Sequence, residues 1–106
     1  MLPEQKIEIS KARFGHAKEC LQDAKLLLAS ESYRSAAKRA YYAIFHAMRA
    51  VLALDGVDMK HHSGIISEFR KRYIKTDAFD TSLSGIISEL SSVREGSDSK
   101  HLSAQY

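Results

Sequence analysis

The sequence predicts an all-α protein: an up-and-down bundle of four main antiparallel helices in a single domain spanning residues 1–106. Two observations predict this class. Residues 32–54 contain no glycine or proline, are rich in alanine, and place bulky apolar side chains at helical steps of three and four. Three further segments show the same period. Because residues 32–54 are so apolar, we expect this helix at the centre of the bundle.

The first two helices are expected to form a hairpin. The first is predicted at residues 4–29, where Pro3 suits a first helical position and an apolar stripe follows one face. The turn at 30–32 is short, so the helix predicted at 32–54 should run antiparallel to the first. Gly56 stands where glycine commonly ends a helix.

Two shorter helices are predicted at residues 62–75 and 79–94, with a loop or frayed tail at 95–106. The sequence Ser-Gly-Ile-Ile-Ser-Glu occurs at 63–68 and again at 84–89. We interpret this as two helices solving the same packing problem, with each glycine allowing a neighbour to approach. Two copies are too few for a solenoid. The side chains expected to be largely buried are Tyr41, Phe45, Phe69, Ile87 and Leu90.

Composition limits the class of protein. A chain of 106 residues, 44% of them apolar, can hold one core. The net charge of +3 tolerates an RNA or nucleotide partner without arguing for one. The single cysteine, Cys20, excludes an internal disulfide and is expected to be buried and inert. The charged start does not fit a signal peptide, and no apolar run is long enough for a membrane span. We therefore expect a cytoplasmic protein that is not bound to a membrane.

Three stretches carry a family resemblance: Arg39-Ala-Tyr-Tyr-Ala-x-Phe45, His62-Ser-Gly-Ile-Ile66 and Leu90-x-x-Val93-Arg94-Glu95-x-Ser97-Asp98. Over about residues 12–98 the chain resembles the HEPN family, small helical proteins of bacteria and archaea. The resemblance implies a helical bundle that dimerises. Such proteins are often encoded beside a minimal nucleotidyltransferase, in pairs that look like toxin and antitoxin. Some are metal-independent ribonucleases that use an arginine and a histidine separated by four to six residues.

The chain departs from the family pattern in two places. Ser99 stands where the family usually has a tyrosine, and the sequence stops at Tyr106, before the further amphipathic helix that the family usually adds. We expect this to leave apolar surface of the first four helices uncovered, which favours dimerisation or instability.

The favoured functional prediction is a dimeric module of a toxin–antitoxin-like system that binds RNA, nucleotides or a nucleotidyltransferase partner and needs no cofactor. Arg94 and Asp98 would then line a groove at the dimer interface. The rival prediction is a metal-independent endoribonuclease that uses Arg94 and His101. A histidine can take the proton from a 2′-hydroxyl, and a guanidinium can hold the phosphate. Gly96 disfavours a continuous helix between Arg94 and His101. In the alternative interpretation, Arg94 and Asp98 form a structural ion pair at the end of the helix. A decayed fragment that keeps only the dimerising scaffold is the third alternative.

His46 and Tyr42 are further candidates for a ligand groove. His46 lies in the middle of the predicted central helix, where a hydrogen-bonded core or interface histidine is favoured over a ligand-binding one. Tyr41 and Tyr42 could stack on a base, although a core position is favoured for them.

No metal site is expected. His61 and His62 would point in different directions on a helix, so they form a poor chelate unless His16 or His46 comes close. The run from Arg70 to Lys75 is the densest cationic patch. It would suit a phosphate backbone, although a solvated helix face also explains it.

Overall fold

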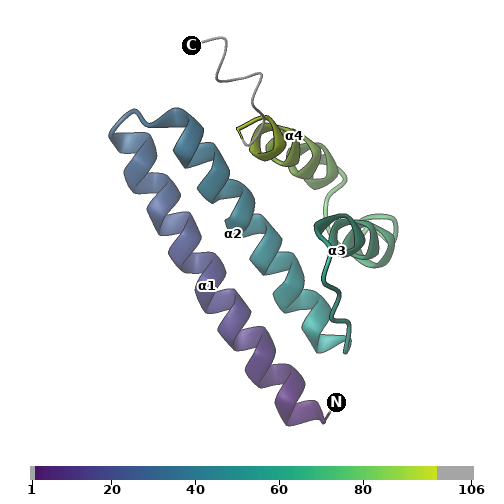
Figure 1. Cartoon of the computed structure of the whole chain (residues 1–106). Helices are drawn as coiled ribbons and strands as arrows, with labels where there is room; N and C mark the ends of the chain where they lie inside the picture. The colour runs from purple at the N-terminus through teal and green to yellow at the C-terminus, as the bar shows by residue number, and fades with distance from the viewer. Residues whose placement is uncertain (1, 98–106) are drawn as a thin grey trace.

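The structure is a computed structural model that describes residues 2–97. Within these residues the chain is helical and contains no strand, as Figure 1 shows, so the all-α prediction is confirmed. None of these helices is both long enough and apolar enough to span a membrane. The elements in chain order are α1 (Pro3–Ala29), α2 (Tyr33–Leu54), α3 (His62–Phe69), the π-helical turn η1 (Arg70–Ile74) and α4 (Ser82–Ser97).

The α1–α2 hairpin is closed by a tight turn. Glu31 adopts a left-handed conformation with φ of 63°. Its N–H donates to the carbonyl of Leu28 (3.0 Å), and the N–H of Ser32 donates to the carbonyl of Leu27 (2.9 Å). These two bonds satisfy carbonyls at the end of α1 and reverse the chain, so the predicted antiparallel hairpin is present.

The end of α2 also has a residue in the left-handed conformation and a hydrogen bond back to a helix carbonyl, but here that residue is a glycine. Gly56 has φ of 76°, and the N–H of Val57 donates to the carbonyl of Leu52 (3.0 Å). The predicted role of Gly56 is confirmed. Just beyond it, Asp58 accepts hydrogen bonds from Arg13 of α1 (3.0 Å) and Arg49 of α2 (3.3 Å), which tie this loop to the hairpin.

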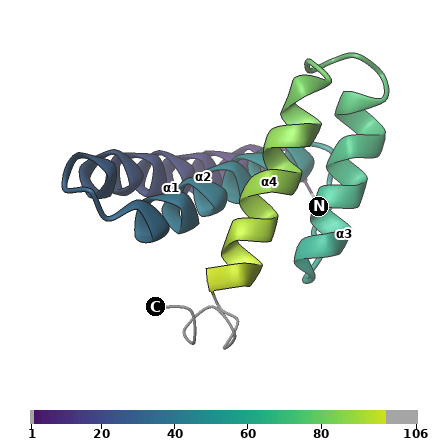
Figure 2. The same cartoon turned by 90° about the horizontal axis from the view of Figure 1, so that it is seen from above.

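Figure 2 shows that α3 and α4 run side by side and cross the α1–α2 hairpin. Helix α2 contacts α1, α3 and α4, so the prediction that it is central is confirmed. Four of the five side chains predicted to be buried are 1–4% exposed, namely Tyr41, Phe45, Phe69 and Ile87. The fifth, Leu90, is only partly buried and packs against this core. Cys20 is buried, as predicted.

Two predicted helix boundaries are corrected. The helix expected at 79–94 begins at Ser82, because Asp80 accepts a hydrogen bond from the N–H of Ser82 (2.9 Å) and caps that end. It continues through Gly96 to Ser97, so the tail expected from residue 95 is still helical there. The helix expected at 62–75 ends at Ile74 and changes to a π-helical turn at Arg70.

The two copies of the repeated sequence pack differently. A Cβ atom added to Gly64 would lie 3.0 Å from the Met59 side chain, whereas one added to Gly85 would meet nothing within 4 Å. Close approach of a neighbour therefore holds for Gly64 only. Ile65 and Ile66 are both buried, but Ile86 is 46% exposed. The interpretation of one shared packing solution is wrong for the second copy.

Candidate functional site

A groove of about 440 Å³ lies between α3–η1 and α4. We call it the α3–α4 groove. Four cationic side chains line it, and Glu95 is its acidic one, so the lining carries a net positive charge. Serine hydroxyls and one imidazole supply further hydrogen-bonding groups. The lining residues are His62, Ser63, Ile66, Ser67, Arg70, Lys71, Lys75, Ser91, Arg94 and Glu95.

Arg94 and His62 both line this groove, and both contact Tyr41. The guanidinium of Arg94 lies over the Tyr41 ring, 5.2 Å from its centroid. The Tyr41 hydroxyl lies 2.7 Å from Nδ1 of His62. Burial raises the pKa of Tyr41, while Arg94 opposes that shift, so the hydroxyl keeps its proton at neutral pH. It can therefore donate to Nδ1 when the imidazole carries its own proton on Nε2.

The His62 ring is held in place by stacking. It lies 3.9 Å from the Phe45 ring, centroid to centroid, with 12° between the planes. Burial lowers the pKa of His62, and the nearby guanidinium groups of Arg94 and Arg49 lower it further. The imidazole is consequently neutral at pH 7 and lies beside Arg94. In the tautomer with its proton on Nδ1, His62 donates to the Tyr41 hydroxyl and leaves Nε2 free, so that Arg94 can hold a phosphate while Nε2 accepts a proton.

The cationic run of η1 divides into structural and solvent-facing members. Arg70 donates to the carbonyl of Ser84 (3.0 Å) and to the Ser88 hydroxyl, which joins η1 to α4. Arg72 forms an ion pair with Glu68 at 2.7 Å, as its four-residue spacing suggests. Lys71 and Lys75 are exposed and line the groove, so they supply its accessible positive charge.

The sequence-predicted candidates are distributed unevenly around this groove. Arg94 lines it. Among the described lining residues neither Tyr42 nor His46 occurs, although the Tyr42 ring lies 6.1 Å from that of His62. Asp98 and His101 lie outside the described residues.

His46 is half-buried on α2. Burial lowers its pKa to about 4, and His16 and Arg49 lower it in the same direction. Its ring packs edge-on against Phe45 (5.6 Å between centroids) and against His16 (4.3 Å). Tyr42 lies beside it, with ring centroids 6.2 Å apart. These contacts place His46 between α1 and α2, away from the α3–α4 groove.

Sequence reasoning missed His62 as a groove residue. The signal was present, because His62 is the first residue of α3 and lies three and four positions before the buried Ile65 and Ile66. Residues at this spacing share a helix face, so His62 had to point toward the core side of α3. Its meeting with Arg94 depends on the packing of α3 and α4 against α2, which local spacing does not encode.

Comparison with known proteins identifies the family. The HEPN domain model matches residues 10–103. A UPF0332 protein of Thermotoga maritima is 45% identical over 60 residues, which cover 57% of this chain and 46% of the relative. The protein named Putative toxin MJ0142 of Methanocaldococcus jannaschii is 34% identical over 82 residues, covering 77% and 56%. The matched region thus spans about half the length of these curated relatives. No solved structure is significantly similar. Because the family model matches nearly the whole sequence, the chain belongs to the HEPN family.

Proposed function

We propose that this chain is a helical module of a toxin–antitoxin-like system and that its α3–α4 groove binds the phosphates of RNA or nucleotides. The family match and the toxin names of two relatives support the first part. The observation that carries the second part is the cluster of Arg70, Lys71, Lys75 and Arg94 around one groove of about 440 Å³.

Each kind of side chain suits a different part of such a ligand. A planar guanidinium such as that of Arg94 binds a phosphate through two parallel hydrogen bonds, and lysines at the edge act as point charges. Lys71 and Lys75 occupy that edge position. Serine hydroxyls donate to phosphate oxygens or to the ribose. The groove therefore favours an anionic, hydroxyl-rich ligand over an apolar one.

Salt-dependent RNA binding tests this proposal. A labelled single-stranded RNA should bind the protein in fluorescence anisotropy, with affinity that falls as salt rises. Replacing both Lys71 and Lys75 with glutamine should weaken binding and reduce the slope of log affinity against log salt by roughly 1.4, since each lost phosphate contact removes about 0.7. Replacing both Lys11 and Lys60 with glutamine is the matched control, because both are exposed and neither lines the groove. Equal effects of the two sets of substitutions would contradict the proposal.

The module is also proposed to act as a homodimer, with its interface on α1 and α2 rather than at the groove that Arg94 lines. Two apolar hollows of about 340 and 300 Å³ lie along this hairpin, and Leu21 lines both. Phe14 and Leu21 are 49% and 46% exposed there, among alanines that allow a second copy to approach closely. Burying this surface against a second copy would remove it from water.

The dimer has its own test. Light scattering after gel filtration should give a dimer for the wild type and a monomer for Leu21→Glu. Leu26→Glu should remain dimeric, because Leu26 is equally apolar and 62% exposed but lines neither hollow. A monomeric wild type would refute this part of the proposal while leaving RNA binding to be judged on the anisotropy result.

The proposed protein partner is a minimal nucleotidyltransferase, which the family resemblance suggests. Co-expression of the chain with a nucleotidyltransferase encoded beside it should yield a complex that survives purification. The absence of such a neighbouring gene, together with no measurable nucleotide binding, would remove the basis for this partner.

A metal-independent ribonuclease is the second candidate function, with Arg94 and His101 as its catalytic pair. The observation that favours an enzyme is that Arg94 shares the groove with a neutral histidine, His62. Purified protein should then cleave total RNA in the presence of EDTA, and Arg94→Gln should abolish cleavage. His101→Ala and His62→Gln, tested separately, identify which histidine acts. The absence of cleavage by a well-folded dimer would reject the enzyme.

A further inference from the structure

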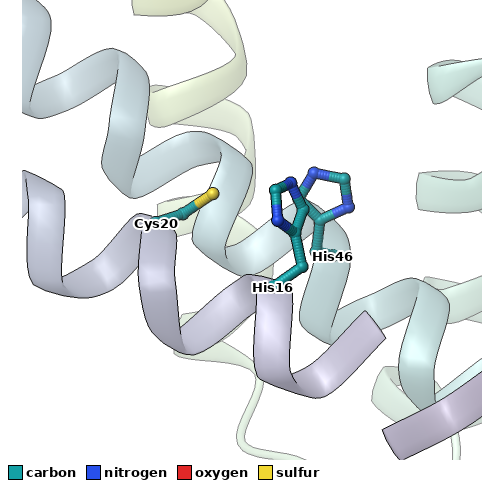
Figure 3. A group of neighbouring side chains, drawn as sticks. All are labelled: His16, Cys20 and His46. Carbon is teal, nitrogen blue, oxygen red and sulfur yellow. The ribbon is translucent and has the colours of Figure 1, made fainter. Parts of the chain in front are cut away.

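A second cluster of chemically active side chains lies away from the α3–α4 groove, between α1 and α2. His16 and Cys20 are one helical turn apart on α1, so their side chains share a face. His46 of α2 completes the group, as Figure 3 shows. One ligand atom from each residue lies within 4.8 Å of the other two.

We propose that His16, Cys20 and His46 form a binding site for a transition-metal ion, with Zn²⁺ as the best-matched ion. Two imidazole nitrogens and one sulfur are the donors that Zn²⁺ prefers, whereas Mg²⁺ and Ca²⁺ require oxygen donors. Three protein ligands would leave one coordination position for water or another ligand. No metal site is expected from the sequence, because the three residues are brought together only by the pairing of α1 with α2.

The distances suit a site that closes on its ion. Tetrahedral zinc with Zn–N bonds of about 2.1 Å and Zn–S bonds of about 2.3 Å separates its ligand atoms by roughly 3.4–3.6 Å. The three atoms lie within 4.8 Å of one another, so a contraction of about 1 Å would suffice. Rotation of the exposed His16 side chain can supply much of this movement without displacing either helix.

The charged side chains around the site are themselves paired. Nη1 of Arg39 lies 4.0 Å from Sγ of Cys20 and donates a weak hydrogen bond to the sulfur. The positive charges of Arg13 and Arg49 are offset by the Asp58 carboxylate that both contact.

Exposure supplies a route to the site. Cys20 is 1% exposed and His46 is half-buried, whereas His16 is exposed. An ion can thus reach the site from the His16 side and be held against a buried sulfur.

Packing alone also accounts for the edge-on contact of the His16 and His46 rings, at 4.3 Å and 66°. It gives no reason for metal binding that involves Cys20, so binding of an ion distinguishes the two explanations.

Cobalt titration of the reduced chain tests the proposal. Co²⁺ replaces Zn²⁺ in tetrahedral sites and reports a thiolate ligand through an intense near-ultraviolet charge-transfer band. We expect this band in the wild type, its displacement by Zn²⁺, and its loss in Cys20→Ser. His16→Ala should weaken Co²⁺ binding by about tenfold or more, because one of three protein ligands is removed. His61→Ala is the matched control, since His61 is exposed and lies outside the cluster.

The outcomes are separable from those of the RNA experiment. If Cys20→Ser loses its helical circular dichroism, His16→Ala decides the matter, because an exposed side chain can be removed without disturbing the core. A wild type without the charge-transfer band, or equal binding by the wild type and His16→Ala, would overturn the metal site. Neither result bears on the α3–α4 groove, and His16→Ala should leave RNA affinity unchanged.

Discussion

The guanidinium of Arg94 lies over the ring of Tyr41, 5.2 Å from its centroid, so the C-terminal part of α4 rests on the middle of α2. The Tyr41 ring is 1% exposed, yet its hydroxyl lies 2.7 Å from Nδ1 of His62. One core side chain therefore contacts two residues that line the α3–α4 groove. This makes the positions of Arg94 and His62 a consequence of core packing, which gives the groove a defined geometry.

Removing the Tyr41 hydroxyl is predicted to destabilise the fold. Tyr41→Phe keeps the ring under Arg94 but deprives His62 of its hydrogen bond, at a loss of about 1–2 kcal/mol in the free energy of unfolding. Urea denaturation followed by circular dichroism measures this loss. Tyr42→Phe is the matched control, because no hydrogen bond joins the Tyr42 hydroxyl to the described residues, and it should change stability by less than about 0.5 kcal/mol. Equal losses would show that the His62 contact contributes nothing.

The exposure of adjacent isoleucines in α4 gives a second prediction. Ile87 is 1% exposed and Ile86 is 46% exposed. Ile87→Ala should therefore lower the free energy of unfolding by about 2–5 kcal/mol, because it leaves a cavity in the core. Ile86→Ala makes the same chemical change on the surface of the monomer and should lower it by less than about 1 kcal/mol. Chemical denaturation at a fixed protein concentration compares the free energies of unfolding of the two variants. A larger loss for Ile86→Ala than for Ile87→Ala would mean that the opposite face of α4 packs against the core.

The sequence predicts the hairpin and the core well because both depend on local rules. Alanine content, apolar period and Gly56 were sufficient for α1, α2 and the turn after α2. The repeated Ser-Gly-Ile-Ile sequence was misleading for the opposite reason. Whether Ile86 is buried depends on which neighbours α4 meets, and the same local sequence has different neighbours in α3 and α4.

The candidate site was predictable only in part. Arg94 and the cationic run were recognised from sequence. Three of the four cations in that run, Arg70, Lys71 and Lys75, line the groove, and Arg72 does not. His62 was not, because its proximity to Arg94 requires α3 and α4 to pack together on α2. The same holds for the meeting of His16 with His46, 30 positions apart in the sequence and joined by the hairpin. Contacts between helices follow from tertiary packing, which residue spacing alone does not specify.

Two glycines are predicted to respond to alanine with opposite signs. Gly56 has φ of 76°, a conformation that a Cβ atom disfavours by about 1–2 kcal/mol, so Gly56→Ala should lower stability. Gly85 lies within α4, and an added Cβ meets nothing within 4 Å. Gly85→Ala should raise stability by about 0.5–1 kcal/mol, since alanine has less conformational freedom to lose. Thermal unfolding of the two variants beside the wild type measures both. A destabilised Gly85→Ala protein would indicate that another molecule approaches this face.

The state of His62 makes stability depend on pH. Its pKa is lowered in the fold by burial, by Arg94 of α4 and by Arg49 of α2. As the pH falls below 6.5, the ordinary pKa, the unfolded chain therefore binds this proton before the folded chain does. Stability that is present above pH 6.5 is consequently lost as the pH falls toward the folded pKa. The slope stays below about 1.4 kcal/mol per pH unit, the limit for one proton, because the ring is partly exposed and its charge is screened.

The prediction is that His62→Gln reduces the loss of stability between about pH 7 and pH 5, the range that brackets the ordinary histidine pKa. His46, whose pKa is also lowered, contributes to acid sensitivity in both proteins, so the difference between them isolates His62. Urea midpoints measured across this range in metal-free buffer supply the comparison. His61→Gln serves as the control, because His61 is exposed at the start of α3 and should leave the wild-type profile unchanged. If His62→Gln and the wild type lose stability in parallel as the pH falls, the His62 imidazole is not held neutral by Arg94 and burial, and it would be available as a cation to the groove.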